Sequence, residues 1–342
     1  MVSTFVNGGA GSELSTDVIA GRFSLSFYIL AATFNLIGIK PIASKLHYFW
    51  IHLLWISTFG IVQGFTGIYL HSWNWITIAP GGFYRVKGFF SNTMTYSYTF
   101  AILLCFLLGF FIYAKKDWKK YLMGATILSI LGSLVLTYTR GMWGAVLMTL
   151  LIMLALVDYS RKLKIKLLAG SSLCLILVFL VSPTLKQRLS TVFDSQFSSN
   201  SMRLEIWSAH WAIAKDNFLI GVGSDNKKQM LLNYLAETKT KYTFAGHAHN
   251  NYLEVLTSSG IIGLLIYLVG FGGVFYLTVK SYNRAKEFLE KSVLLGSIGA
   301  QSVFHLGGLT ECTFLDYEVL YAMTFVMAIS AVVVKNQSRT TT

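Results

Sequence analysis

Apolar stretches long enough to cross a lipid bilayer recur along almost the whole chain. Of its 342 residues, 54% are hydrophobic and only 13% are charged, whereas a soluble domain has about 25% charged residues. A spanning helix needs about 20 mostly apolar residues. We therefore predict an all-α, polytopic integral-membrane helical bundle. Nine segments qualify as predicted spans: 24–40, 47–70, 95–114, 121–138, 142–158, 167–183, 251–279, 292–308 and 318–334.

The net charge of +13 is distributed very unevenly between the two sides of this predicted bundle. When alternate loops are assigned to opposite sides, one side has 16 basic and four acidic residues, and the other has 12 basic and 11 acidic residues. Basic loops mark the cytoplasmic side of a membrane protein. The excess of lysine and arginine therefore indicates topology, and a nucleic-acid partner is not expected.

This topology places the N-terminus and the segments 71–93, 139–141, 184–250 and 309–317 on the outer side. Residues 1–20 have neither the basic start nor the apolar core of a cleavable signal peptide. Cys105 and Cys174 fall in predicted spans and Cys312 lies alone outside, so no disulfide framework is expected. We predict a single integral-membrane domain, 1–342, with 184–250 inserted as an outer loop.

The inserted segment 184–250 is too long for a simple connection, and loops of that length usually have structure or function of their own. Its pattern predicts one helix from Asn200 or Ser201 to about Asp216, and a second from Ser224 or Asp225 to about Glu237. The sequence Gly221-Val222-Gly223 predicts a sharp bend between them. Glycine pairs within the spans, such as Gly260 and Gly263, predict close helix packing.

Three arginines on the outer side are candidates for binding an anion. Arg140 lies in the short turn between two predicted spans, Arg203 opens the first loop helix, and Arg85 precedes a span. A guanidinium group matches phosphate oxygens in a bidentate fashion, and a charge in a tight turn between spans is costly unless it is paired. Anchoring at the lipid interface is the alternative for each arginine taken singly.

Three acids in the last outer turn, Glu311 among them, could pair with these arginines or bind sugar hydroxyls, and we expect pairing.

The polar pair His249-Asn250 closes the longest polar stretch and opens an apolar helix at the membrane boundary. An imidazole titrates near neutral pH and can take a proton from a hydroxyl group, while an interfacial or capping role remains an equal alternative. Asn250 can cap the helix in either case. His247 and His249 have metal-like spacing, but no further ligand lies nearby in the sequence, so a metal site is not expected. No serine or cysteine motif supports a covalent intermediate, and no Walker sequence supports an ATP motor.

The spacing of His249-Asn250, nine residues and then Gly260-Ile261-Ile262-Gly263 resembles the signature of bacterial O-antigen ligases, within the O-antigen ligase and polymerase superfamily. Further motifs extend this resemblance over roughly residues 85–320 in the family's order. They are Arg85 to Asn92, Thr139 to Trp143, Arg203 to Trp207, Ile220 to Gly223, and Gly308 to Glu311.

The resemblance implies a membrane glycosyltransferase of lipopolysaccharide biosynthesis in the bacterial inner membrane, with its active site on the periplasmic face. Such enzymes transfer an undecaprenyl-diphosphate-linked glycan to a sugar hydroxyl, with inversion and without metal, nucleotide or other cofactor. In the ligases the acceptor is lipid A-core. Carried over by position, His249 is the base that activates the acceptor hydroxyl. Arg140 and Arg203 hold the diphosphate of the donor, and Arg85 is a third candidate.

Three other functions remain open from the sequence, one of which is an oligosaccharide-to-protein transferase. An O-antigen or exopolysaccharide polymerase has the same motifs but uses another lipid-linked glycan as its acceptor. A transporter of the lipid-linked glycan would also need outer arginines, although it should tolerate the loss of His249. Family members usually have more spans than the nine expected here, so the chain is expected to be a shorter relative or to lack N-terminal spans.

Overall fold

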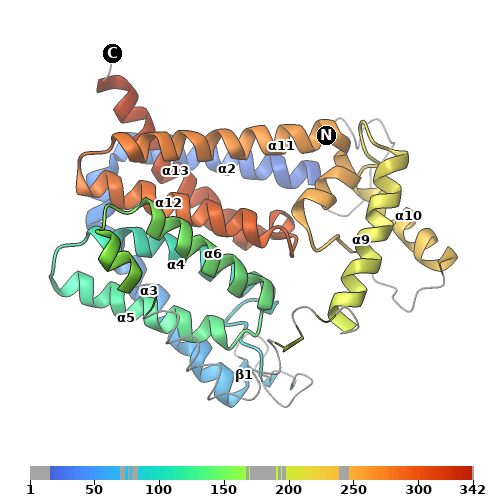
Figure 1. Cartoon of the computed structure of the whole chain (residues 1–342), viewed down its shortest axis with the longest axis horizontal. Helices are drawn as coiled ribbons and strands as arrows, with labels where there is room; N and C mark the ends of the chain where they lie inside the picture. Colours follow the sequence, from blue (N-terminus) through green and yellow to red (C-terminus); the bar gives the residue numbers. More distant parts are fainter. Residues whose placement is uncertain are drawn as a thin grey trace.

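The structure, a computed structural model, is a bundle of long helices with two further helices at one end (Figure 1). It describes residues 16–69, 74–75, 78, 84–166, 169, 190–191, 194, 198–238 and 246–340. The bundle helices are α2 (Thr16–Ile37), α3 (Ile39–Thr66), α4 (Thr93–Tyr113), α5 (Trp118–Val135), α6 (Arg140–Leu156), α11 (Asn251–Arg284), α12 (Phe288–Gly307) and α13 (Tyr317–Thr340).

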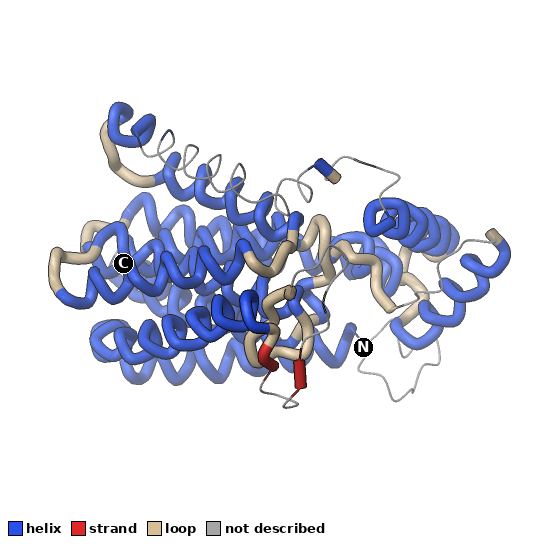
Figure 2. The backbone as a smooth tube through the Cα atoms, turned by 90° about the horizontal axis from the view of Figure 1, so that it is seen from below, coloured by secondary structure: helices blue, strands red, loops and turns tan. Residues whose placement is uncertain are grey.

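These helices confirm the predicted helical membrane fold. Eight of the nine predicted spans coincide with a described helix, and the ninth, 167–183, lies almost wholly outside the described residues. Four described helices are long and apolar enough to cross a membrane: Ile39–Thr66, Thr93–Tyr113, Asn251–Arg284 and Tyr317–Arg339. A two-residue antiparallel pairing, β1 (Ile68–Tyr69) with β2 (Asn74–Trp75), lies at the end of α3 (Figure 2).

Helix α4 forms the centre of the bundle, and α11 lies at its surface. Nearly all side chains of α4 from Thr95 to Leu107 are buried, whereas Ile262, Ile266 and Val269 of α11 are exposed. A row of exposed apolar side chains on a long helix is what a lipid-facing surface requires. Close contact between α4 and α12 depends on Gly109 and Gly296, because a Cβ added to Gly109 would lie 2.4 Å from the backbone nitrogen of Gly296.

The two predicted loop helices are present as α9 (Ser198–Asp216) and α10 (Ser224–Glu237), beyond one end of the bundle (Figures 1 and 2). They pack through a small apolar cluster that includes Ala209, Ile213, Leu231 and Leu235. His210, on the buried face of α9, lies 3.1 Å from the Thr257 hydroxyl of α11, measured from Nδ1 to Oγ1. The long insertion therefore has its own core and is fixed to the start of α11.

Gly260 breaks α11 instead of promoting helix packing, which corrects the role expected from the sequence. Its backbone has φ 66° and ψ −170°, a conformation that favours glycine. The polar groups released by the break pair with the α9–α10 connection: Val222 N–H donates to Thr257 O at 3.1 Å, and Ile261 N–H donates to Phe218 O at 2.8 Å. The break at Gly260 is thus one of the points at which the α9–α10 segment is attached to the bundle.

Candidate functional site

His249 lies in a strained turn immediately before α11. Its φ is +48°, an uncommon backbone conformation for a residue other than glycine and one that persists only when surrounding contacts fix it. Asn250 caps α11, as predicted: its side-chain oxygen accepts hydrogen bonds from Tyr252 N–H at 2.9 Å and Leu253 N–H at 3.0 Å. Its amide nitrogen donates to Leu309 O at 3.1 Å. The cap therefore links this turn to the last outer turn.

The neighbouring Asn251 fixes that last turn to α11. It is fully buried, its side-chain amide donates to the Thr313 hydroxyl at 2.8 Å, and its side-chain oxygen accepts from Phe314 N–H at 3.0 Å. Its own backbone N–H donates to Gly308 O at 2.7 Å. Two segments far apart in sequence, 247–251 and 308–314, are consequently held together as one rigid unit.

Glu311 is the acceptor at the centre of this unit. Its Oε1 lies 2.8 Å from His249 Nδ1 and 3.8 Å from His247 Nδ1, and its Oε2 lies 3.7 Å from Arg203 Nη2. Burial raises the pKa of Glu311, but the hydrogen bond from His249 and the charges of His249, His247 and Arg203 outweigh it, so the net pKa lies below its usual value. Glu311 is thus an ionised orienting group for His249.

A second carboxylate supports the same turn. Glu254 in α11 forms a buried ion pair with Lys227 of α10, and its other oxygen accepts from Ala248 N–H at 2.9 Å. Trp207 Nε1–H donates to Ala248 O at 2.8 Å. Both backbone polar groups of the residue preceding His249 are therefore fixed by the outer helices and α11, which explains how the strained conformation is maintained.

The three predicted arginines are connected through neighbouring residues. Arg140, the first residue of α6, donates to Asn200 Oδ1 at 2.9 Å and to Thr191 O at 2.6 Å. Asn200 precedes Arg203 by three residues on α9, so both occupy one helix face. Arg85 donates through Nε to Thr137 O at 3.0 Å and through Nη2 to Thr139 Oγ1 at 3.5 Å. Because Thr139 directly precedes Arg140, these bonds connect Arg85 to the start of α6.

The contact between α6 and the last outer turn is unusually close. A Cβ added to Gly141 would lie 2.3 Å from Thr310 Oγ1, so only glycine fits there without displacement. Gly141 follows Arg140 and Thr310 precedes Glu311. This packing therefore sets the distance between the arginine-bearing end of α6 and the His249–Glu311 pair.

One argument made from the sequence against a metal site is wrong. The potential ligand atoms of His247, His249 and Glu311 lie within 4.8 Å of one another. The missing third ligand comes from a residue 62 positions after His249, so local sequence inspection could not find it. The cluster has the donor types that Zn²⁺ uses.

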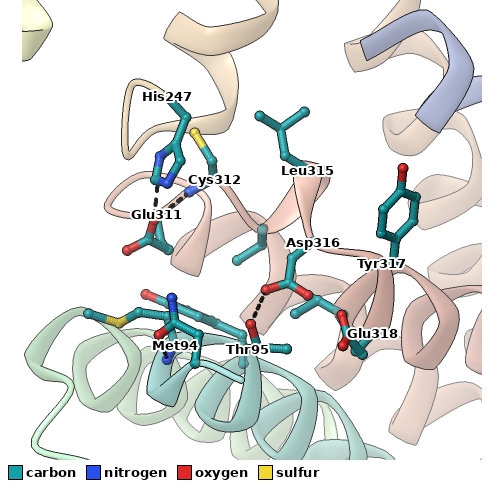
Figure 3. Close-up of a pocket in the computed structure, with 13 residues that line it drawn as sticks. Met94, Thr95, His247, Glu311, Cys312, Leu315, Asp316, Tyr317 and Glu318 are labelled. Atoms are coloured by element: carbon teal, nitrogen blue, oxygen red, sulfur yellow. Dashed lines mark hydrogen bonds and ion pairs between the residues drawn. The ribbon is translucent and has the colours of Figure 1, made fainter. Parts of the chain in front are cut away.

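A cavity of about 230 Å³ opens beside Glu311 (Figure 3). The N-terminal end of α4 and the segment from Glu311 to Val319 line it, with His247 at one edge. Asp316 Oδ2 accepts a hydrogen bond from Thr95 Oγ1 at 2.5 Å. Burial, followed by the neighbouring Glu318, raises the pKa of Asp316 to about 6. The three predicted arginines do not belong to its lining, although Arg203 lies beside Glu311 at its edge.

The expectation that the outer acids pair with arginines is confirmed for Glu311, whereas Asp316 interacts with Thr95 instead. Sequence reasoning missed Asn251, the Lys227–Glu254 pair and the role of Glu311 in orienting His249. The second asparagine directly after Asn250 was visible, but its contact with Thr313 requires the tertiary structure. Substrate binding by Asn250 stays a prediction, since its amide is engaged in the cap and with Leu309.

A family model described as O-antigen ligase matches residues 125–268, which run from α5 into α11 and include Arg140, Arg203 and His249. No curated protein matches the chain. The family match supports an O-antigen ligase or polymerase type of membrane glycosyltransferase, and it confirms the resemblance of this chain to the O-antigen ligase-like superfamily.

Proposed function

We propose that this protein transfers an undecaprenyl-diphosphate-linked glycan to the hydroxyl of an acceptor sugar at the periplasmic face of the bacterial inner membrane. The acceptor that we propose is lipid A-core, which makes the protein an O-antigen ligase. The observation that carries the proposal is the 2.8 Å contact between His249 Nδ1 and Glu311 Oε1, with Arg203 beside the same carboxylate. This arrangement combines an oriented base with a cation that can face an anionic leaving group.

In the proposed reaction, Glu311 favours the tautomer of His249 with the proton on Nδ1, which leaves the basic lone pair on Nε2. Nε2 takes the proton of the acceptor hydroxyl as its oxygen attacks the anomeric carbon of the donor sugar. The bond from that carbon to the diphosphate oxygen breaks, and the diphosphate leaves with the electron pair. A single displacement of this kind inverts the anomeric carbon.

The arginines stabilise the charge that grows on the leaving diphosphate. Arg203 and Arg140 contribute from α9 and α6, and Arg85 supports the turn in front of Arg140. Because the diphosphate bond supplies the driving force, the protein needs only to position the two substrates and stabilise charge.

The decisive experiment measures glycan transfer by His249→Ala in proteoliposomes, with donor binding determined separately. We expect turnover to fall by about 10²–10⁴-fold, the usual contribution of a general base, while donor binding is retained. Turnover at the level of the unaltered protein would rule out the base and favour a transporter. A matched control is His52→Ala, because His52 lies on the exposed side of α3, away from the site.

The acceptor identifies the member of the superfamily. Transfer of the donor glycan to purified lipid A-core supports the ligase. Longer chains on the lipid carrier, without transfer to lipid A-core, would instead make the protein a polymerase.

Arg140→Ala and Arg203→Ala should each weaken binding of the diphosphate-linked donor. The lysine variants should recover only part of this binding, because lysine keeps the charge but lacks the bidentate fork of arginine. Unchanged binding in both alanine variants would contradict the anion site.

The same assay tests whether the reaction is independent of metal. We expect a chelator such as EDTA to leave the rate unchanged, because the imidazole and guanidinium groups supply the base and the positive charge. A different result would assign the His247, His249 and Glu311 cluster to a catalytic metal. In that case EDTA would remove the activity, Zn²⁺ would restore it, and His247→Ala would prevent the restoration.

A further inference from the structure

The cavity beside Glu311 has a chemistry unlike that of the arginine-bearing surface. Three carboxyl groups line it, from Glu311, Asp316 and Glu318, together with the polar side chains of Asn92 and Thr95. In Figure 3, Glu311 and Asp316 lie on the same chain segment, with Thr95 of α4 opposite Asp316. A strongly acidic lining repels a diphosphate, so this cavity is suited to a different part of the substrates.

Three of the residues that line this cavity have a buried side-chain oxygen without a hydrogen-bond partner. Glu311 Oε2, Asp316 Oδ1 and the Tyr317 hydroxyl are each buried without one in the described structure, and all three residues belong to the lining. Arg203 lies 3.7 Å from Glu311 Oε2, beyond hydrogen-bond distance. Burying polar oxygens in this way is costly unless a ligand or water supplies the missing donors.

Carboxylates only accept hydrogen bonds, so a matching ligand must present donors and no negative charge. Neutral sugar hydroxyls meet both conditions. The cavity has a volume of about 230 Å³, just below the ~300–1,000 Å³ of pockets that bind drug-sized ligands. A cavity of this size suits one sugar residue. Glu311 also orients His249, so a sugar bound here would have its hydroxyls next to the proposed base.

We propose that this acidic cavity binds the terminal sugar of the acceptor, with Asp316 and Glu311 as hydrogen-bond acceptors for its hydroxyl groups. The proposal rests on the proposed glycosyl transfer, and it divides the site into two halves. The arginines of α6 and α9 take the diphosphate of the donor, and the segment 311–318 takes the uncharged acceptor sugar. Thr95 acts as a positioning residue, because it holds Asp316 through Oδ2.

The first test measures sugar binding directly, by saturation-transfer NMR on the full chain in detergent. Glucose and protonated glucosamine are expected to bind, and glucose 6-phosphate to bind more weakly, because its charge is repelled. Asp316→Asn should weaken glucose binding roughly tenfold, the effect of losing a hydrogen bond to a charged group. Asp158→Asn is the matched control, since Asp158 pairs with Lys291 far along the bundle from this cavity.

The second test is kinetic. Asp316→Asn should raise KM for the acceptor while KM for the donor and kcat stay near their original values, and Thr95→Val should change acceptor KM in the same direction. A folded Asp316→Asn variant with unchanged glucose binding and unchanged acceptor KM overturns the proposal, as does preferential binding of glucose 6-phosphate. If Asp316→Asn does not fold, Thr95→Val and Glu318→Gln decide by the same measurements.

These outcomes are separable from the failure of the proposed function. Full turnover by His249→Ala overturns the transfer chemistry whatever the sugar binding is. Loss of turnover in His249→Ala combined with normal acceptor KM in the cavity variants leaves the transfer intact and removes only the acceptor assignment.

Discussion

His249 and Glu311 are 62 residues apart in the chain, and their side chains meet at 2.8 Å between Nδ1 and Oε1. His249 comes from the turn before α11 and Glu311 from the turn between α12 and α13. Asn250 and Asn251 hold both turns together through Leu309, Thr313 and Phe314. The position of the imidazole is therefore determined by two loops that form one rigid unit.

Glu311→Gln should lower kcat while donor binding changes little. Glutamine keeps the size of the side chain, but it removes the negative charge and can donate to Nδ1, which favours the wrong tautomer of His249. We expect at least about a tenfold loss, within the range of general-base contributions. Glu237→Gln, at the exposed end of α10, is the control. A rate equal to that of the unaltered protein would contradict the orienting role of Glu311.

Gly141→Ala should reduce activity by displacing Thr310 and with it Glu311. The added Cβ would lie 2.3 Å from Thr310 Oγ1, and a shift of about 1 Å in a site can cost up to about 10²-fold in rate. Gly144→Ala is a control in the same helix, because nothing lies within 4 Å of its Cβ.

The double variant Gly141→Ala with Thr310→Ala provides the internal check on that explanation. Removing the Thr310 hydroxyl makes room for the new methyl group, so activity should recover in part. If the double variant is as inactive as Gly141→Ala, the contact with Thr310 is not the cause.

Gly260→Ala should destabilise the attachment of α9 and α10 to α11. A residue with a Cβ is strained by about 1–3 kcal/mol at this backbone conformation, which is essentially restricted to glycine, and the Cβ would lie 2.3 Å from Leu219 O. Limited proteolysis of the purified protein should then cleave the 198–238 region faster. Gly270→Ala in the same helix has open space around its Cβ and should leave the cleavage rate unchanged. Equal protection in both variants would argue against the break as an attachment point.

Lys227→Met should lower the thermal stability of the protein markedly, because it leaves Glu254 buried without its counter-charge. Breaking a buried ion pair from one side typically costs ~3–5 kcal/mol. The double variant Lys227→Met with Glu254→Gln should recover part of that loss, since a glutamine oxygen can still accept from Ala248 N–H. Lys228→Met, at an exposed position next in sequence, is the control. Thermal unfolding in detergent measures all three, and a double variant no more stable than Lys227→Met would count against the pairing.

Asp316 should make stability fall as the pH rises from about 4 to about 6. Its pKa is about 6 in the folded protein, raised from 3.8 by burial and by Glu318, so the folded state holds the proton more tightly than the unfolded state. The resulting stabilisation is fully present below pH ~4 and is lost as the pH rises through about 6. Asp316→Asn should therefore show a smaller decrease in Tm between pH 4 and pH 7 than Asp158→Asn does. Identical pH dependence in both variants would contradict the raised pKa.

The sequence by itself determined the helical membrane fold, since apolar length and low charge leave few alternatives to spanning helices. It also determined the two helices of the long insertion, whose bounds were predicted to within three residues, and it supplied Arg140, Arg203 and His249 as candidates. The predictions of the fold and of the two helices are confirmed because they depend on hydropathy and periodicity, both of which are local.

Only the tertiary structure decided what surrounds those residues. The partner of His249 comes from the turn between α12 and α13, and the break at Gly260 is satisfied by the α9–α10 connection. The Lys227–Glu254 pair joins an outer helix to a membrane helix. Periodicity specifies which face of a helix is apolar, but it does not specify which distant turn that helix will meet. Such contacts depend on how several helices pack at once, and they set the geometry of the site.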